Sequence, residues 1–166
     1  MVRTVRHVTV LTLIAAGVTF FGCAPAFPRE ALDRVNRRIS FRELLSDPDK
    51  FKGSWIMIAG NIVSLKNVPA GTIIEILQKP MDDDGKPLDT DTSEGRFIVQ
   101  TKQFLDAAIY LQGRPLTVIG EIIGKKFMPL DEILYQYPLL DAKAIHLWRP
   151  STGPRFFFGI SISGEM

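Results

Sequence analysis

Five short segments between residues 54 and 148 are rich in Ile, Val, Leu and aromatic residues, and turn-forming residues separate them. Runs of this composition and length are typical of β-strands in a small domain. The segments span 54–65, 71–79, 95–101, 115–124 and 139–148. A chain of 166 residues has room for one such domain with its own core. A five-stranded barrel is therefore the expected fold.

Two details refine this expectation. Gly60 and Gly120 lie in the middle of the first and fourth segments, where a glycine marks a bulge or a tight bend of a closed barrel. Apolar residues at helical spacing between the third and fourth strands predict a helix that Gly113 would end. These residues are Phe104, Leu105, Ala108 and Leu111. The sequence thus predicts a mainly β, OB-like antiparallel barrel of five to six strands with one or two short helices, over residues 40–149.

The residues before the barrel predict two short helices. In the segment 23–39, Leu32, Val35 and Ile39 recur at the spacing of an amphipathic helix. Ser40 and Glu43 fit a capping box, which predicts a second helix over about 41–46. Three arginines surround the first helix, and they form a solvated face or meet anionic lipid head groups. They are Arg34, Arg37 and Arg38.

Residues 1–22 have the pattern of a bacterial export signal. Arg3 and Arg6 form a basic start, and an apolar run follows over 8–21. This run is shorter than the roughly 20 residues that cross a bilayer as a helix. We therefore expect a signal segment that is removed, with a short uncleaved membrane anchor as the alternative.

Cys23 directly follows the apolar run and is the only cysteine of the chain. Because no second cysteine can pair with it, its position favours thioether lipidation. Gly22 suits a lipoprotein signal, whereas the bulky Phe20 and Phe21 do not. A plain signal or an unprocessed anchor is therefore the alternative. Cleavage before Cys23 would leave 18 basic residues against 18 acidic ones.

Few residues are available for catalysis or metal binding. His146 is the only histidine after the signal segment, and it lies in a strand-like run, so a packing role is expected. The acidic loop 82–94 fits a calcium loop poorly, because Pro80 would occupy its first ligand position and Asp91 its twelfth. Asp82, Asp84 and Gly85 are therefore expected in a solvated loop. We predict no enzyme activity, no metal and no cofactor.

Nucleic-acid binding is not expected either. The net charge is only +2, and Phe97 is the one aromatic residue on the second and third strands. Tyr135, Tyr137 and Trp148 form either an aromatic patch or ordinary packing. The segment 150–166 contains the run Phe156–Ser163, which either adds a strand to an edge or stays mobile.

Several short motifs, in their order and spacing, resemble the Slp family of bacterial outer-membrane lipoproteins. They are Trp55 to Ile62, Thr72 to Ile76, Lys79 to Asp82, Gly85 to Pro87, Ser93 to Phe97, Phe104 to Asp106, Tyr110 to Arg114, Leu116 to Gly120, Tyr135 to Pro138 and His146 to Trp148. Physically these motifs look architectural. Asp106 can cap a helix, Pro138 can start the last strand, and Arg96 can pair with Glu75 across neighbouring strands.

The resemblance implies a starvation-inducible lipoprotein of the Gram-negative outer membrane with no established reaction. The lipid-bearing cysteine of the family corresponds to Cys23, and Ala24 after it is compatible with outer-membrane sorting. The expected partners are the membrane, through a lipid on Cys23, and an envelope protein. We expect a non-catalytic role in envelope maintenance or stress adaptation, by binding or scaffolding. The alternative is a periplasmic module that binds a glycan, a lipid or a small solute.

Overall fold

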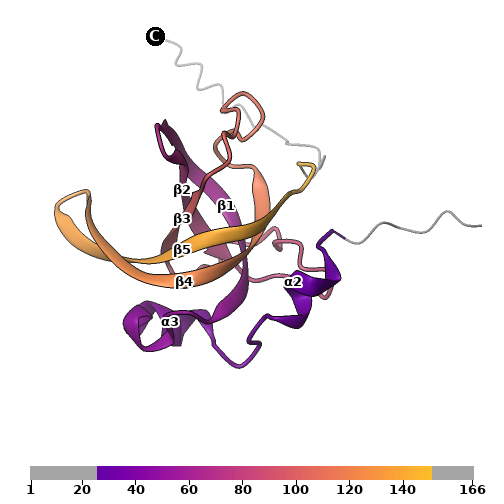
Figure 1. Cartoon of the computed structure of the whole chain (residues 1–166). Helices are drawn as coiled ribbons and strands as arrows, with labels where there is room; N and C mark the ends of the chain where they lie inside the picture. The colour runs from indigo at the N-terminus through magenta and orange to yellow at the C-terminus, as the bar shows by residue number, and fades with distance from the viewer. Residues whose placement is uncertain (1–25, 151–166) are drawn as a thin grey trace, which may run out of the picture.

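The computed structural model describes residues 26–150 (Figure 1). Cys23, the signal segment 1–22 and most of the segment 150–166 lie outside the described residues. Three short helices precede five strands. The elements are α2 (Arg29–Asp33), α3 (Phe41–Ser46), η1 (Pro48–Phe51), β1 (Trp55–Val68), β2 (Gly71–Lys79), β3 (Arg96–Thr101), β4 (Pro115–Leu130) and β5 (Ile133–Leu147). Within the described range, no helix is long and apolar enough to cross a membrane.

The five strands close into a barrel in the order β1–β2–β3–β5–β4. Neighbouring strands are antiparallel, except that β3 and β5 run parallel and pair Ile98 with Leu139. This order is that of an OB-like barrel. The mainly β, five-stranded closed barrel predicted from the sequence is confirmed.

Alternating side chains of the strands fill the barrel. Ile74, Ile76, Phe97 and Val99 are fully buried, and the residues that alternate with them in β2 are half-buried on the outer face. Phe41 of α3 joins the same core and packs edge-on against Phe97, with ring centroids 5.8 Å apart. The interior of the barrel is therefore a packed core rather than a ligand chamber.

The capping box of α3 is present as predicted. The Ser40 hydroxyl oxygen accepts a hydrogen bond from the Glu43 N–H at 3.2 Å, and the Ser40 N–H donates to the Glu43 carboxylate at 3.0 Å. These hydrogen bonds lower the pKa of the Glu43 carboxyl. The cap fixes where the chain turns from the segment before α3 into the helix.

The predicted helix around Leu32, Val35 and Ile39 is wrong in its extent, because α2 ends at Asp33. Val35 instead forms a single parallel bridge with Trp55, and the Asn36 N–H donates to the Trp55 carbonyl at 2.8 Å. Pairing with β1 therefore replaces the next helical turn.

Helix α2 packs on the outside of the barrel. Phe27 and Ala31 are buried against Ile119 of β4, and Trp55 and Met57 of β1 lie beside them. Residues 26–33, the first part of the chain that the structure describes, are thus packed onto the barrel.

Strands β4 and β5 extend well beyond the expected ends at 124 and 139. Residues 125–130 pair with 133–138, and this hairpin arm projects from the barrel on the left of Figure 1. Asp131 makes the turn with a φ of 52°, a left-handed conformation that aspartate tolerates. Pro138 does not start the strand as predicted; it pairs with Lys125 beside a register shift in β4.

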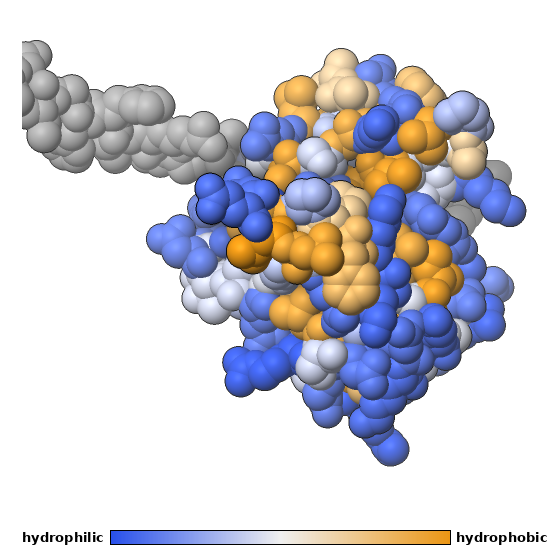
Figure 2. Space-filling view, turned by 90° about the vertical axis from the view of Figure 1, so that its left-hand side faces the viewer, coloured by the Kyte–Doolittle hydropathy of each residue, from blue (hydrophilic) through white to orange (hydrophobic). Residues whose placement is uncertain are grey.

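The arm carries apolar side chains at the surface. Phe127, Ile133 and Leu134 are exposed by 53%, 60% and 70%. Figure 2 views the molecule from the side to which the arm extends, and it shows apolar groups among hydrophilic ones on this face. Single exposed apolar residues are common on soluble domains, so their grouping on the arm is the noteworthy feature.

The helix predicted around Phe104–Leu111 is absent from the described structure, which has turns there. The Asp106 carboxylate accepts a hydrogen bond from the Ala108 N–H at 2.8 Å, which caps a turn rather than a helix. Leu105 is buried, and its N–H donates to the Thr72 hydroxyl at 3.0 Å. Phe104 and Leu111 are exposed, so the helical spacing did not reflect a buried face.

Candidate functional site

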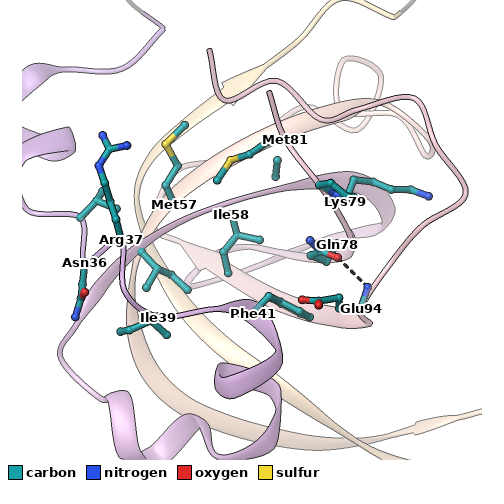
Figure 3. A pocket seen from close by; sticks show the side chains of 14 residues that line it. Asn36, Arg37, Ile39, Phe41, Met57, Ile58, Gln78, Lys79, Met81 and Glu94 are labelled. Carbon is teal, nitrogen blue, oxygen red and sulfur yellow. Dashed lines mark hydrogen bonds between the residues drawn. The ribbon is translucent and has the colours of Figure 1, made fainter. Parts of the chain in front are cut away.

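An open cavity lies beside β1 at the point where β2 ends. The last pair between the two strands joins Ala59 and Lys79, so β1 continues past the end of β2. The segment 35–41 and the residues just after β2 pass over this place, and they enclose a volume of about 310 Å³ (Figure 3). Cavities of roughly 300–1,000 Å³ are typical of ligand sites.

The walls of the cavity are mainly apolar. Phe41, Ile56 and Ile58 form its floor with their core-facing side chains, and Met57 and Met81 stand at its edge. Met81 is 40% exposed. This lining can hold apolar groups, and the two methionines can adapt to their shape.

Gln78 is the central polar group of the cavity and is only 9% exposed. Its Oε1 accepts a hydrogen bond from the Glu94 N–H at 2.9 Å. Its amide nitrogen donates to no group in the described part of the chain. The cavity therefore contains a hydrogen-bond donor that is available to an occupant.

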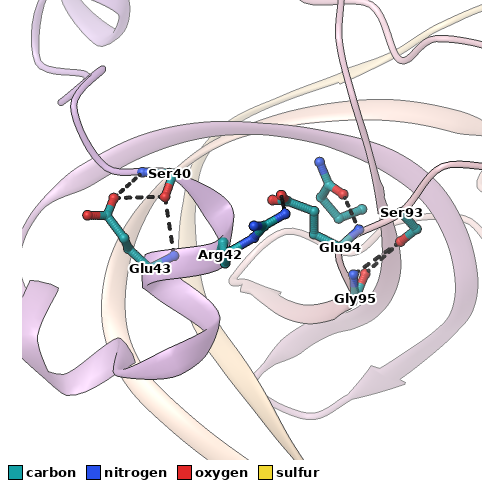
Figure 4. A network of polar contacts seen from close by, with 7 residues as sticks. Ser40, Arg42, Glu43, Ser93, Glu94 and Gly95 are labelled. Atoms are coloured by element: carbon teal, nitrogen blue, oxygen red, sulfur yellow. Dashed lines mark hydrogen bonds and ion pairs between the residues drawn. The ribbon is translucent and has the colours of Figure 1, made fainter.

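A network of polar contacts holds the wall of the cavity near Glu94 (Figure 4). The Glu94 carboxylate pairs with Arg42 of α3 at 3.2 Å, and Ser93 and Gly95 bond to each other. Lys79 is 7% exposed, and its Nζ donates to the Thr90 carbonyl at 2.6 Å. These contacts tie the start of β3 to α3 and the end of β2, which fixes the cavity wall.

A second depression of about 740 Å³ adjoins the cavity. The two share Arg37, Met57 and Met81, and Trp148 lies in the lining of the second one. The Arg37 side chain has no hydrogen-bond or ion-pair partner within residues 26–150. The two hollows meet at the three shared residues, and the second one combines apolar side chains with the acidic residues Asp82, Asp83 and Asp84.

In the acidic loop, the Asp82 carboxylate binds backbone N–H groups of the loop itself. The Asp82 side chain accepts hydrogen bonds from the N–H groups of Asp84 and Lys86 at 3.1 and 2.8 Å. Among the described residues, no group of three or more His, Cys, Asp or Glu side chains is placed to hold a metal ion. Asp82 and Asp84 are exposed, whereas Gly85 is buried against Met57 rather than solvated.

His146 lies between two aromatic rings on the outside of the barrel. Its ring centroid is 5.9 Å from that of Phe27 and 4.3 Å from that of Trp148. Trp148 also donates its indole N–H to the Thr117 hydroxyl at 3.0 Å. The surroundings of His146 are thus those of a packing residue.

The three aromatic residues that the sequence suggested as a patch, Tyr135, Tyr137 and Trp148, lie at two separate places on the barrel. Tyr135 and Tyr137 pack edge-on with centroids 4.7 Å apart, whereas Trp148 packs with His146. Tyr137 is buried, and its hydroxyl donates to the Glu75 carboxylate at 3.1 Å. No single aromatic patch unites these residues.

The expected pairing of Arg96 with Glu75 is present at 2.8 Å, and it is half-buried rather than exposed. Glu75 raises the pKa of Arg96 by stabilising its charged form. Burial, followed by the charge of Glu75, raises the pKa of Tyr137. The Glu75 carboxylate accepts hydrogen bonds from both Arg96 and Tyr137. The cluster therefore stabilises the barrel wall, and its polar groups are occupied by one another.

Known proteins resemble this chain in sequence and in fold. An uncharacterized protein of Haemophilus influenzae is 29% identical over 143 residues, which cover 85% of this chain and 75% of that protein. A small single-stranded DNA-binding protein of Streptomyces coelicolor has 16% identity and a TM-score of 0.35, over 56% of this chain and 92% of its own. A mitochondrial single-stranded DNA-binding protein of S. cerevisiae has 16% identity and a TM-score of 0.34, over 58% of this chain and 95% of its own.

A family model described as the outer membrane lipoprotein Slp family matches residues 20–156. The match includes Cys23, the whole barrel and the hairpin arm. Membership places the protein in the outer membrane as a lipoprotein. The chain belongs to the Slp family of outer membrane lipoproteins.

Proposed function

We propose that the protein carries its lipid on Cys23 and acts in the outer membrane by binding or scaffolding, without catalysis. Cys23 is the only cysteine of the chain, and thioether lipidation needs a cysteine. Family membership implies lipid anchoring, and the residue that bears the lipid is the part of the proposal to be tested.

The burial of Phe27 carries this proposal. Phe27 is 3% exposed and packs on the barrel only four residues after Cys23. An extended chain gains at most about 3.5 Å per residue, so the tether spans roughly 14 Å. A lipid on Cys23 would therefore hold the barrel directly at the membrane surface, as a platform rather than as a domain on a long linker.

The described residues favour a non-catalytic role. The barrel interior is packed, His146 lies between two aromatic rings, and the Glu75–Arg96–Tyr137 cluster is internally paired. Catalytic groups need an accessible partner in a cleft, which these groups lack.

Membrane fractionation tests the anchor. Wild-type protein should sediment with the outer membrane and remain there after washes with high salt and with alkaline carbonate, because acyl chains hold it. The Cys23→Ser chain should leave this fraction. Cys23→Ser protein that stays in the outer membrane through both washes would overturn the proposal. A Ser161→Cys variant in the Cys23→Ser background controls for the mere presence of a thiol.

The cavity beside β1 favours a second candidate function, the binding of a glycan, a lipid or a small solute. Its volume of about 310 Å³ and the free amide of Gln78 are the supporting observations. A ligand at 100 times its Kd should stabilise the protein by about 2.7 kcal/mol. Thermal unfolding with each solute class would detect this, and a Met57→Trp variant that fills the cavity should abolish the shift.

A further inference from the structure

The hairpin arm is a rigid projection of the barrel. Residues 125–130 and 133–138 pair with each other, and no other described strand lies beside them. At about 3.3 Å per residue, the arm reaches roughly 17 Å from the barrel. Two contacts hold its base: the Gln136 amide donates to the Leu45 carbonyl at 2.9 Å, and the Tyr135 hydroxyl accepts from the Arg96 N–H at 3.1 Å. Consecutive strand residues point to opposite faces, so the arm is fixed from both sides.

Beyond these contacts, both faces of the arm carry apolar side chains. Cross-strand partners share a face, and the pairs here are Pro129 with Leu134 and Leu130 with Ile133. Leu134 and Ile133 are therefore largely exposed on opposite faces, and Phe127 is exposed on the face of Leu134. Apolar side chains grouped in this way on a projecting element are typical of an interaction surface.

Charge is distributed unevenly along the arm. At its base, Lys125 pairs with Asp49 at 3.0 Å, and the exposed Lys126 beside it has no ion pair within residues 26–150. The turn at the other end contains Asp131 and Glu132, which are exposed and likewise make no ion pair in that range. The arm thus has a free positive charge at its base, apolar side chains along its length and two free negative charges at its tip.

The backbone of the arm is poorly suited to bind an extended peptide. Pro129 lies in its β4 part and Pro138 in its β5 part, and proline has no N–H to donate to a neighbouring strand. Prolines at strand edges protect against the addition of another strand. The contacts of the arm are therefore expected through its side chains.

A lipid surface is also a poor fit. Figure 1 shows the arm on the side of the barrel opposite to α2, which is the described element nearest to Cys23 in the sequence. The carboxylates of Asp131 and Glu132 would have to enter the bilayer first, and charged groups are costly in its apolar part. These features favour a protein partner with complementary charge.

We propose that the arm binds the arm of a second copy of this chain, with the two arms side by side in opposite directions about a two-fold axis. The acidic tip of each arm then lies beside Lys126 of the other, and the apolar side chains between them cover one another. A two-fold axis makes every contact occur twice. Two arms in the same direction would instead bring like charges together. The association needs no lipid, so its test is independent of the anchor on Cys23.

Charge reversal tests the opposed arrangement. Lys126→Glu and Glu132→Lys are made separately in the full chain with Cys23→Ser, which is the parent chain. Sedimentation velocity at low salt gives the dissociation constant of each variant alone and of an equimolar mixture of the two. Lys66→Glu, at an exposed position of β1 outside the arm, is the matched control.

The parent chain should form dimers, and each arm variant alone should have a dissociation constant at least about tenfold higher, because two attractive contacts become repulsive. The mixture should regain the affinity of the parent, since opposite charges face each other again at both contacts. Lys66→Glu should have no effect. Dimers of either arm variant as tight as those of the parent, or a mixture that does not regain the affinity, would overturn the proposal.

The apolar contact has its own variant. Leu134→Ser keeps every charge of the arm, and it should raise the dissociation constant at least about tenfold, because the side chain is lost from both arms. Phe104→Ser removes an apolar side chain of similar exposure outside the arm and should leave the constant unchanged. A urea midpoint equal to that of the parent shows that the Leu134→Ser chain is folded. Equal dissociation constants for the two serine variants would contradict the apolar contact.

The oligomeric state also separates a second copy from a lipid surface. A parent chain that stays monomeric at about 0.1 mM would overturn the proposal. Monomers that bind vesicles of phosphatidylethanolamine and phosphatidylglycerol, with the binding lost in Leu134→Ser, would overturn it as well and would assign the arm to the membrane.

Discussion

The guanidinium of Arg34 lies over the indole ring of Trp55, with its Cζ atom 3.9 Å from the ring centroid. Arg34 is the C-cap residue directly after α2, and Trp55 begins β1. The contact therefore joins the first described segment of the chain, residues 26–34, to the barrel. Together with buried Phe27, it makes this segment a fixed part of the domain rather than a flexible tether.

Replacing Arg34 should weaken this junction measurably. The cation–π contact is worth about 0.5–1 kcal/mol at an exposed site, so Arg34→Ala should lower the free energy of unfolding by that amount. Urea denaturation of the Cys23→Ser chain measures the change. Arg38→Ala is the control, because the Arg38 side chain has no partner among residues 26–150. A loss for Arg38→Ala as large as that for Arg34→Ala would show that general charge, not the stacking, is responsible.

A methyl group at Gly60 should be costly. A Cβ at this position would collide with the Leu77 carbonyl oxygen and with the Ile76 side chain, because β1 and β2 approach closely there. Overpacking of this kind costs about 3 kcal/mol when backbone must move. We expect Gly60→Ala to shift the urea midpoint accordingly.

Gly53→Ala is the matched control for Gly60→Ala. Nothing lies within 4 Å of a Cβ at Gly53, although its φ of +83° makes a side chain strained. Its cost should be about 1–2 kcal/mol, from backbone strain alone. Equal costs for the two variants would contradict the close approach at Gly60.

Tyr137 should make the protein less stable in alkali. Burial and Glu75 raise the pKa of Tyr137 above its ordinary value of 10.0, so the folded state holds the phenolic proton more tightly than the unfolded state does. This contribution to stability is complete below pH 10 and is lost as the pH rises through the raised pKa.

Urea denaturation on both sides of pH 10 checks this dependence. The free energy of unfolding of the wild type should fall more steeply with pH than that of Tyr137→Phe, which has no phenolic proton. Tyr135→Phe controls for the neighbouring tyrosine. Parallel pH profiles for wild type and Tyr137→Phe would show that the proton of Tyr137 is not linked to folding.

The local parts of the fold could be predicted because their signals are local. The capping box needs only Ser40 and Glu43 three residues apart, and each strand carries its own apolar composition. The hairpin arm was missed because Pro129, Asp131 and Pro138 usually break strands. Here the Pro138 position lies next to a register shift, and Asp131 adopts a left-handed turn.

The apolar spacing around Leu105 misled for a different reason. Of the four apolar residues at that spacing, only Leu105 joins the core, where its N–H donates to the Thr72 hydroxyl, and Phe104 remains exposed. In so short a segment, apolar residues at helical spacing do not predict a helix reliably, because a single residue can be buried by tertiary contacts without a helix forming.

The candidate site could not be predicted from the sequence. Arg37, Met57 and Gln78 come from a linker and two strands, and no local motif connects them. The cavity exists because β1 begins at Trp55, whereas its pairing with β2 begins only at Ala59. This offset is a property of strand pairing rather than of composition. Cys23 could be proposed because its position after an apolar run is itself a sequence signal.

The intact mass of the protein extracted from purified outer membranes tests the central claim most directly, with the Cys23→Ser chain purified from whole cells as the comparison. The account predicts a mature chain that begins at Cys23 and carries the added mass of acyl chains, and no such mass in the variant. An unlipidated wild-type chain, whether full length or cut at another residue, would contradict it, and the anchor would then have to be sought in the segment 1–22.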